Sequence, residues 1–453
     1  MRHHHQAGQP PGRLAYFTLL GTSSLATLTS TIINAPITRI AADLEVSDRQ
    51  IVLAVSTFTI VMVLFAPVAG WLSQRYGAKR YLVTSLLLMA VGQYGAAVAD
   101  SLTWLVLMRG VQGLACSAIP PAIQQTFTAF WQDRRPQALA AWASAIGLGQ
   151  ALGPPLGGGI TALAGWRAVF VVQGTLTLVA LLLAARHAPA PRAVPMRLHG
   201  VGMTLLVAGA GLLVTAATLL GQRISLSLEL GLLGAGLVSV AAFVLVSRNN
   251  PRALVPPRLL VEPLFLQTTV TAGTSMAAMG ISAVTVPLYL GGRLGMEPGR
   301  IGLIAFAMAA TMFTFAPVTS RLAERFTARR VMLLGLAVLL VGPVVLTVFS
   351  WPSATPGGIT GVIVGLAIIG AGVAATQSTA AMGVLRSPAA DFGAALGIHN
   401  MVRFAGLALG YAWVSIAYPS GSLALVHSGT LALVLTSLAV VGLSGSDAWD
   451  RTD

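Results

Sequence analysis

The stretch FAPVAGWLSQRYGAKR, at Phe65–Arg80, occurs twice in this chain. Its second copy reads FAPVTSRLAERFTARR, at Phe315–Arg330. In each copy an apolar helix containing a proline leads into a short basic turn, and another apolar helix follows. Two halves that carry the same element are typical of membrane transporters built from internal repeats. We therefore expect two related helical bundles with a central pathway between them.

The amino-acid composition indicates a membrane protein. Of the 453 residues, 55% are hydrophobic and 9% are charged, against about 25% charged in soluble domains. The formal net charge of +14 would suggest nucleic-acid binding only if the basic residues were clustered on one face. They lie instead in small groups between apolar runs, as in cytoplasmic loops. We expect no nucleic-acid partner and, with one cysteine, no intrachain disulfide.

The apolar runs are long enough to span a bilayer, which takes about 20 mostly apolar residues. The first run, Leu14–Ile40, is too long for the core of a signal peptide, so we expect it to be a spanning helix. By the same criterion fourteen spans are expected, near 14–40, 50–72, 81–99, 102–130, 137–161, 166–186, 200–221, 228–247, 264–291, 301–320, 331–351, 357–384, 393–417 and 422–444.

The spacing of the two repeat copies predicts six helices, two inserted helices and six more. Most loop arginines then fall on the side that holds both termini, which predicts that both termini are cytoplasmic. The expected parts are a cytoplasmic tail at 1–13, a six-helix bundle at 14–186, a cytoplasmic linker at 187–199, the inserted pair at 200–247, a second cytoplasmic linker at 248–263, a six-helix bundle at 264–444 and a cytoplasmic tail at 445–453.

Two arginines lie inside apolar runs. Arg109 shares a helix face with Gln112 and Cys116. An arginine at the membrane centre costs about 2.5–3.5 kcal/mol, so it must face the bundle interior or a watery cavity. We expect a pathway role for Arg109, and an arginine that hydrogen-bonds backbone carbonyls between packed helices is the alternative.

The second intramembrane arginine, Arg403, belongs to a polar cluster. His399 lies one turn earlier on the same face, and Asn400 lies beside it. An imidazole can change charge near neutral pH, so His399 is a candidate proton carrier. A packed histidine that only hydrogen-bonds its neighbours is the alternative.

The fifth span contains GLGQALGPPLGGGI, at residues 147–160. Gly149, Gly153 and Gly157 are spaced by four, so they form a bare stripe on which another helix can pack. Pro154, next to Gly153, is expected to bend or break the helix. The stripe fits either a packing seam or the hinge of a gating helix, and the spacing does not separate the two.

Together these residues resemble the major facilitator superfamily and, within it, the fourteen-helix drug:proton antiporter branch. The resemblance covers nearly the whole chain. It is carried by Gly70, Leu72, Arg75, Gly77, Lys79 and Arg80 between helices 2 and 3, by Arg109, Gln112 and Gly113 in helix 4, by Gly149, Gly153, Pro154, Gly157 and Gly158 in helix 5, by Trp166, Arg167 and Phe170 in the following turn, and by Asn400, Arg403, Gly406 and Gly410 in helix 13.

The resemblance implies an all-α integral membrane protein with the major facilitator fold. It also implies a secondary transporter that exports a drug or antibiotic across the cytoplasmic membrane in exchange for protons. In that family the helix 4 arginine takes part in proton and substrate handling, and the helix 5 element is a hinge or seal. The helix 2–3 turn is a cytoplasmic lock, which here comprises Gly70, Gln74, Arg75, Gly77 and Arg80, with Arg321, Glu324 and Arg325 in the repeat copy.

Two positions depart from the family pattern. The lock usually has an acid where this chain has Gln74, and helix 1 usually has an aspartate where this chain has Thr29. A cation exporter would use such a carboxylate to bind the cation and to exchange it for a proton. We therefore expect a neutral, zwitterionic or anionic substrate, with a pathway lined by Arg109, Gln112, Asn34, Thr29, His399, Asn400 and Arg403, and with Gln267 and Gln377 as further candidates.

Other classes of function fit less well. The sequence has no nucleotide-binding loop and no recurring set of catalytic groups, so we expect neither an ATP-driven pump nor an enzyme, and no metal or cofactor. The expected partners are a small-molecule substrate, protons and the lipid bilayer, and we expect a monomer. A facilitator or importer of a small solute and a transporter-derived sensor remain as alternatives, which flux measurements in vesicles would separate.

Overall fold

A computed structural model provides the structure of the chain. It describes residues 12–131, 135–191, 193, 200–220, 225–248, 250, 257–349, 356–391, 393–443 and 449. These residues form α-helices with one short π-helical and two short 3₁₀ segments. Most of the expected tails and much of the two linkers lie outside the described residues.

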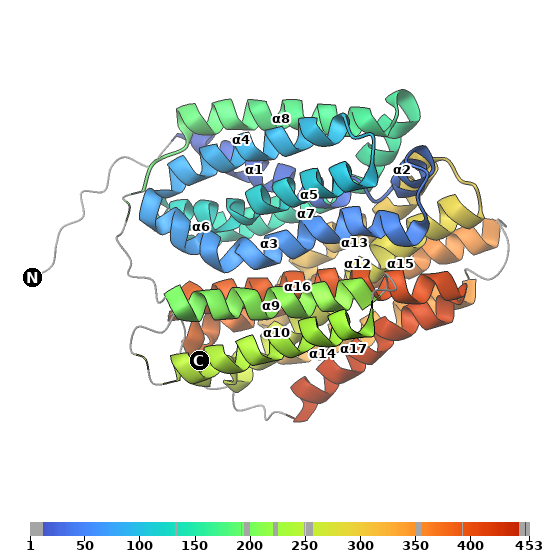
Figure 1. The fold of residues 1–453 in the computed structure, drawn as a ribbon. Coiled ribbons are helices and arrows are strands. Elements are labelled where there is room, and N and C mark those ends of the chain that lie inside the picture. The colour runs from blue at the N-terminus through green and yellow to red at the C-terminus, as the bar shows by residue number, and fades with distance from the viewer. Residues whose placement is uncertain are drawn as a thin grey trace, which may run out of the picture.

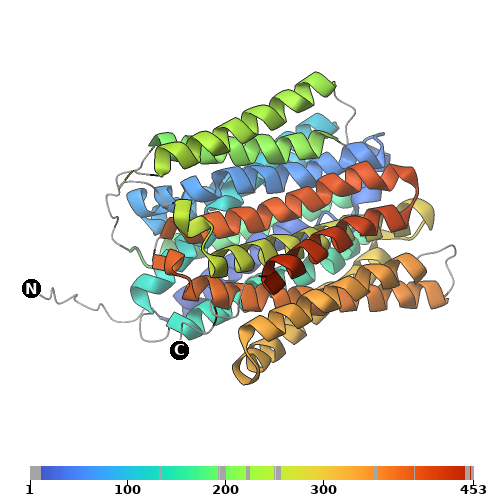
Figure 2. The same cartoon turned by 90° about the horizontal axis from the view of Figure 1, so that it is seen from below.

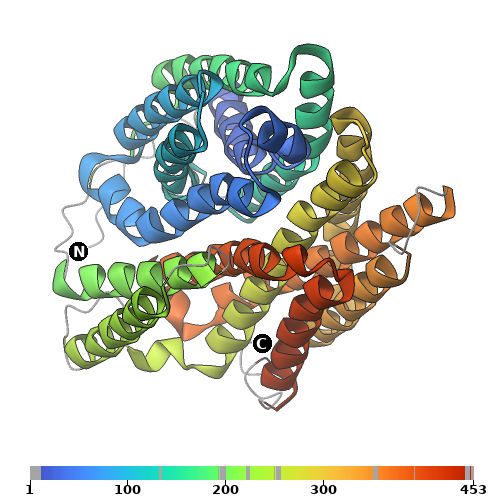
Figure 3. The same cartoon turned by 45° about the vertical axis from the view of Figure 1, so that its right-hand side comes forward.

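The first half of the chain forms a group of helices that pack on one another. Figure 3 shows them, blue to teal, around a common centre. Their closest pairs are α3 with α5, α4 with α8, and α1 with α7. The helices are α1 (Arg13–Thr31), α2 (Ile37–Asp43), α3 (Asp48–Tyr76), α4 (Ala78–Ala97), α5 (Leu102–Ser117), α6 (Ile119–Phe130), α7 (Arg135–Ala164) and α8 (Trp166–His187).

A pair of helices, α9 (Gly200–Leu220) and α10 (Leu226–Ser247), precedes the second group. In the second group the closest pairs are α14 with α15, α12 with α16, and α13 with α15. Its elements are α11 (Pro257–Leu260), α12 (Pro263–Leu288), η2 (Tyr289–Arg293), α13 (Pro298–Arg325), α14 (Ala328–Phe349), α15 (Pro356–Arg386), η3 (Pro388–Asp391), α16 (Gly393–Ala417), η4 (Tyr418–Ser420) and α17 (Leu423–Leu443).

The inserted helices cover one seam between the two groups. Helix α9 contacts both α3 and α16, and Figure 2 shows the green pair along the flank of blue α3 and red α16. The contact is close, because a Cβ at Gly211 would lie 2.1 Å from Cδ2 of Leu64. A buried apolar cluster joins all three parts through Val63, Leu206, Phe243, Phe265, Ile398 and Met401.

A helix occupies each of the expected spans. Within the part of the chain that the structure describes, eleven spans are long and apolar enough to cross a membrane, and α1, α4 and α7 are not among them. The expectation of a single helix over Leu14–Ile40 is wrong. Helix α1 ends at Thr31, a turn follows, and α2 begins after Pro36, where the proline has no N–H to continue a helical ladder. Helix α7, in contrast, continues unbroken through Pro154.

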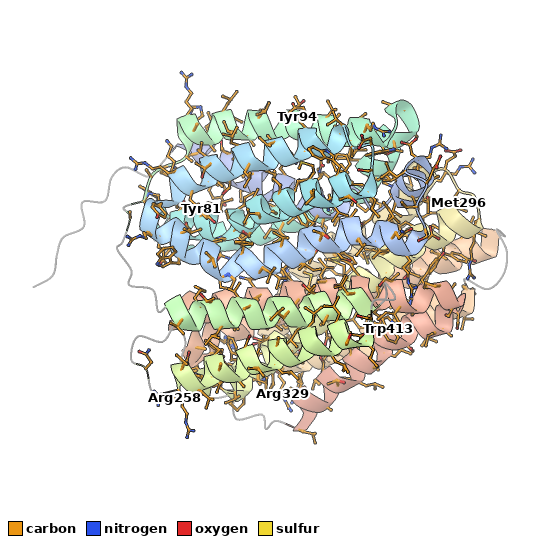
Figure 4. The ribbon with its side chains drawn as sticks, viewed as in Figure 1. Tyr81, Tyr94, Arg258, Met296, Arg329 and Trp413 are labelled. Atoms are coloured by element: carbon orange, nitrogen blue, oxygen red, sulfur yellow. The ribbon has the colours of Figure 1, made fainter. Side chains whose placement is uncertain are left out.

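The helices run roughly parallel between two ends of the molecule (Figure 1). We call the end with the two repeated basic turns, around residues 75–80 and 325–330, the basic end. The opposite end, with α2 and η2, is the far end. Figure 4 shows Arg258 and Met296 at these opposite ends.

Candidate functional site

A cavity of about 30 Å³ lies between the two helical groups. This volume holds about two or three water molecules. Six helices or their connections contribute to its wall, and none of the lining side chains is charged. The lining residues are Thr31, Asn34, Gln150 and Pro154 from the first group, and Met279, Ser282, Ala283, Val286, Ala305, Met308, Ala309, Met312, Leu366 and Tyr411 from the second.

Asn34 is a cavity residue with unused hydrogen-bonding capacity. It lies in the turn after α1 and is 1% exposed. Its amide interacts with the Tyr411 hydroxyl, but neither Oδ1 nor Nδ2 makes a hydrogen bond of ordinary geometry with the described residues. A buried polar group left unpaired costs about 1–3 kcal/mol, so this amide is suited to bind water or a ligand in the cavity.

The two helical groups are in close contact at the far end. A Cβ at Gly158 of α7 would lie 2.2 Å from the carbonyl oxygen of Pro298 on α13. A Cβ at Gly302 of α13 would lie 2.4 Å from the carbonyl oxygen of Pro154. On the neighbouring seam, Nε of Arg49 donates to the backbone oxygen of Ser415 at 3.4 Å. The cavity is therefore closed toward the far end.

The same face of α13 is uncovered nearer the basic end. Gly299 and Gly302 face α7, and helical spacing places Phe313 and Pro317 on the same face. Phe313 is 46% exposed, and Pro317 is exposed as well. Helices α7 and α13 therefore pack closely at the far end and leave this face of α13 free toward the basic end.

Arg109 is fully buried inside the first helical group. Its Nε donates to the Ala54 oxygen at 3.1 Å, and Nη1 donates to the Thr29 oxygen at 3.1 Å and to Oε1 of Gln112 at 2.8 Å. The guanidinium lies 4.4 Å from the centre of the Phe58 ring, and Nη2 has no hydrogen-bond partner among the described residues. Arg109 thus ties α1, α3 and α5 together and is not part of the cavity wall.

Thr29 connects three helices through its hydroxyl. The hydroxyl donates to the Leu25 oxygen at 2.9 Å. It accepts hydrogen bonds from Nε2 of Gln93 at 3.2 Å and from Nε2 of Gln173 at 3.3 Å. Nε2 of Gln112 donates to the Gly92 oxygen at 2.8 Å, so α4 is joined to the same network.

The second expected cluster lies on α16, apart from the first. Nδ1 of His399 lies 3.0 Å from Oγ1 of Thr269 on α12. The guanidinium of Arg403 lies 5.4 Å from the Phe404 ring, and its Nε has no partner among the described residues. Asn400 is half-buried beside them. These side chains are not part of the cavity wall either.

The glycine stripe of α7 packs against α1. A Cβ at Gly149 would lie 2.0 Å from the Ser24 oxygen, one at Gly153 1.9 Å from Oγ1 of Thr31, and one at Gly157 1.9 Å from the Ile32 oxygen. Pro154 has no N–H to donate to the Gln150 oxygen, and Oγ1 of Thr31 donates to that oxygen at 3.5 Å instead.

The lock residues lie at the basic end. Gly77 joins α3 to α4 with φ +91°, and Arg75 lies 5.7 Å from the Trp71 ring. Gly70 borders open space, Gln74 is half-buried and Arg80 is exposed. In the repeat copy Arg325 lies 5.5 Å from the Phe326 ring and Arg321 is exposed, whereas the Glu324 side chain is outside the description.

The salt bridge among the described residues lies elsewhere, between Asp43 and Arg167 at the far end. Arg167 also donates to the Ala99 oxygen at 2.9 Å, and Nε1 of Trp166 donates to the Asp43 carboxylate at 3.0 Å. The hydrogen bond from Arg167 is the main reason that the pKa of Asp43 lies below its usual value. This group fastens α2 to α8.

Sequence reasoning missed most of the cavity wall. Tyr411, Met279, Met308 and Met312 carry no motif, although Tyr411 lies two turns after Arg403 on α16. The further candidates Gln267 and Gln377 have other partners. Oε1 of Gln267 accepts from Nε1 of Trp449 at 2.7 Å, and Nε2 of Gln377 donates to Oγ of Ser275 at 2.8 Å.

Comparison with known proteins identifies the family. The chain is 27% identical over 406 residues to the uncharacterized transporter YebQ of Escherichia coli K12, a match that covers 89% of this chain and 88% of YebQ. It is 26% identical over 395 residues to the multidrug resistance protein Stp of Mycobacterium tuberculosis, covering 85% and 72% of the two chains.

A solved structure supports the fold. A crystal structure of the peptide transporter POT in complex with sulfate superposes with a TM-score of 0.72 at 15% sequence identity, and the match covers 96% of this chain and 97% of that one. The family model of the Major Facilitator Superfamily matches residues 19–200 and 268–448. The chain therefore belongs to the Major Facilitator Superfamily, as a multi-pass membrane transporter and not an enzyme.

Proposed function

We propose that this transporter exports a small amphipathic drug or antibiotic across the cytoplasmic membrane by alternating access, in exchange for protons. The observation that carries the proposal is the cavity between the two helical groups, closed toward the far end by α7 and α13. The match to a protein named for multidrug resistance supports export of a drug.

The proposed arrangement in the membrane has fourteen spanning helices, with α1, α4 and α7 added to the eleven that meet the length and hydropathy criterion. Two six-helix bundles, at 14–186 and 264–444, flank the inserted pair. Both termini and the basic end are cytoplasmic, because arginines concentrate in cytoplasmic loops. In this orientation the uncovered part of α13 lies toward the cytoplasmic end of the molecule, the side from which an exporter takes its substrate. We propose a monomer.

Alternating access requires the contact between α7 and α13 to break at the far end while a new contact forms at the basic end. The glycines at this contact allow the two backbones to meet and separate as rigid units. The proposed hinge of α7 consists of Gly149, Gly153, Pro154 and Gly157. Thr31 of α1 packs against this hinge and would move with it. In the conformation that is open at the far end, the lock turns at residues 70–80 and 321–325 would keep the cytoplasmic side closed.

The cavity wall supports a neutral substrate. None of the lining side chains is charged, and burying an unpaired charge there would be costly. Three methionines, Met279, Met308 and Met312, give the wall a flexible apolar surface that can adapt to different shapes. Of the neutral, zwitterionic and anionic classes, the neutral class suits this wall best.

The proposed proton site is His399 on α16. It is buried and titratable, and Thr269 holds its Nδ1. Arg403 lies one turn away on the same face of this helix. Arg109 supports this cycle by fixing α1, α3 and α5 to one another.

The test is proton flux in everted membrane vesicles. A pH-sensitive dye is quenched when the vesicles are energised, and neutral, anionic and cationic antibiotics are then added in turn. The expected result is a collapse of the pH gradient with a neutral compound that is absent in vesicles with Arg109→Gln or His399→Ala. Thermal unfolding of both variants checks that they fold. Movement of labelled substrate down its gradient without proton movement would show a facilitator instead.

A further inference from the structure

Two amide side chains, those of Asn34 and Gln150, line the cavity. Asn34 is 1% exposed, and its Oδ1 and Nδ2 lack hydrogen bonds of ordinary geometry with the described residues. Two of the other polar lining groups already make hydrogen bonds. Oγ of Ser282 donates to the Ala278 oxygen at 3.0 Å, and Oγ1 of Thr31 donates within α1 and to Gln150.

The backbone around Asn34 holds this amide in place. Its N–H donates to the Thr31 oxygen at 3.1 Å, and its carbonyl oxygen accepts from the N–H of Ile37 at 3.5 Å. Both sequence neighbours, Ile33 and Ala35, are fully buried. The amide is therefore preorganised, so that a ligand need not first order it.

An asparagine amide offers one acceptor and two donor hydrogens side by side. A ligand that places an N–H beside a C=O satisfies both sides at once, whereas a carboxylate offers only acceptors and an amidinium only donors. We infer that the cavity recognises a neutral substrate through such a paired donor and acceptor, as in a carboxamide, and that Asn34 is the residue that determines this specificity.

The rest of the wall agrees with such a ligand. The Tyr411 hydroxyl lies beside the amide and interacts with it, so it is placed to contact the same polar group. Met279 and Met308 supply an apolar surface for the body of the ligand. The closed cavity of about 30 Å³ has room for the polar head only, so the apolar body of an amphipathic neutral amide would lie between the two helical groups once they separate. This inference rests on the proposed function, since it treats the cavity as the substrate site.

The test uses three ligands with the same apolar body: 4-butylbenzamide, 4-butylbenzoate and 4-butylbenzamidinium. Binding to the purified full chain in detergent micelles is measured by calorimetric titration. We expect the wild-type protein to bind the amide about tenfold more tightly than either charged analogue. The variant Asn34→Leu, which removes both polar atoms, should lose this preference.

The variant Asn34→Asp should change the ligand preference in a defined direction. Its carboxylate has acceptors only, so the preferred ligand should change from the amide to the amidinium, by about tenfold in the ratio of the two dissociation constants. Because this variant gains an affinity, misfolding does not produce the expected result. Thermal unfolding without ligand checks both variants.

Stronger wild-type binding of the benzoate or the amidinium, or no binding of any of the three, would overturn the inference. An unchanged order of the three ligands in Asn34→Asp would overturn it too. The proposed function fails separately. If the amide binds as expected but everted vesicles move neither substrate nor protons, the recognition stands and the transport proposal does not.

Discussion

The guanidinium of Arg109 donates a 3.1 Å hydrogen bond to the backbone oxygen of Thr29, the position where the antiporter branch that this chain resembles usually has an aspartate. A buried cation normally has a buried counter-ion. None of the acidic side chains in the described residues forms an ion pair with Arg109. Backbone oxygens, Gln112 and the Phe58 ring stabilise its charge instead.

Replacing Thr29→Asp should give Arg109 a counter-ion, at the cost of the hydrogen bond that the Thr29 hydroxyl donates to the Leu25 oxygen. The carboxylate can accept from Gln93 and Gln173 as the Thr29 hydroxyl does. We expect the variant to fold and to gain efflux of ethidium, a permanent cation, because the added carboxylate offsets the buried positive charge of Arg109, which would otherwise repel a cation. Ethidium accumulation in cells measures this. Thr29→Asn is the uncharged control, and equal accumulation in both variants would contradict the prediction.

The close contact at the far end predicts opposite behaviour for two adjacent glycines. Gly158→Ala would place a Cβ 2.2 Å from the Pro298 oxygen, so α7 and α13 must separate. Gly159→Ala meets no atom within 4 Å and is the control. We expect only the first change to raise the rate at which an impermeant maleimide, added from the far side, labels a cysteine placed at Met308 in a Cys116→Ala background. Equal labelling in the two variants would place the far-end gate elsewhere.

Two glycines of the lock should respond to alanine with opposite signs. Gly77 has φ +91°, and the nearest atom to an added Cβ would be 4.0 Å away, so the cost of Gly77→Ala is backbone strain, about 1–3 kcal/mol of stability. Gly70 lies inside α3 beside open space, so Gly70→Ala should add about 0.5–1 kcal/mol. Thermal unfolding in detergent compares them. A stabilising Gly77→Ala would show that the turn relaxes away from this conformation.

The salt bridge between Asp43 and Arg167 predicts a dependence of stability on pH. The folded pKa of Asp43 lies below the ordinary 3.8, so its contribution is fully present above that value and is lost as the pH falls through the folded pKa. The difference in unfolding midpoint between wild type and Asp43→Asn should be constant from neutral pH to about pH 5 and then shrink. Added salt should reduce it at all pH values, because both side chains are nearly half exposed. A difference that grows in acid would contradict this account.

The sequence was sufficient for the local features of the fold. Helix positions follow from apolar length, and the contact between Arg109 and Gln112 follows from helical spacing and is present at 2.8 Å. The spacing of the glycines in α7 fits either a packing seam or the hinge of a gating helix, and the structure shows that the stripe packs on α1. The end of α1 at Thr31 was missed, because residues 32–35 are almost as apolar as the helix and only Pro36 marks the turn.

The cavity could not be predicted from the sequence for a physical reason. Helix α12 is buried on nearly all sides. Its sequence therefore has no periodic pattern that would distinguish cavity residues such as Met279 and Ser282 from residues that only pack. Which of them face the other bundle depends on contacts between distant segments. Charged residues stand out within apolar runs, which is why Arg109 and Arg403 are the candidates that the sequence offers. Both lie outside the cavity wall in this conformation.

The inserted pair makes the two sides of the transporter unequal. Helix α9 covers the junction of α3 with α16, and Gly211 lets it approach Leu64 closely. The junction of α7 with α13 has no comparable cover among the described helices. If the cavity is the substrate site, as proposed, an amphipathic compound dissolved in the lipid would meet two covering helices at the first junction and none at the second.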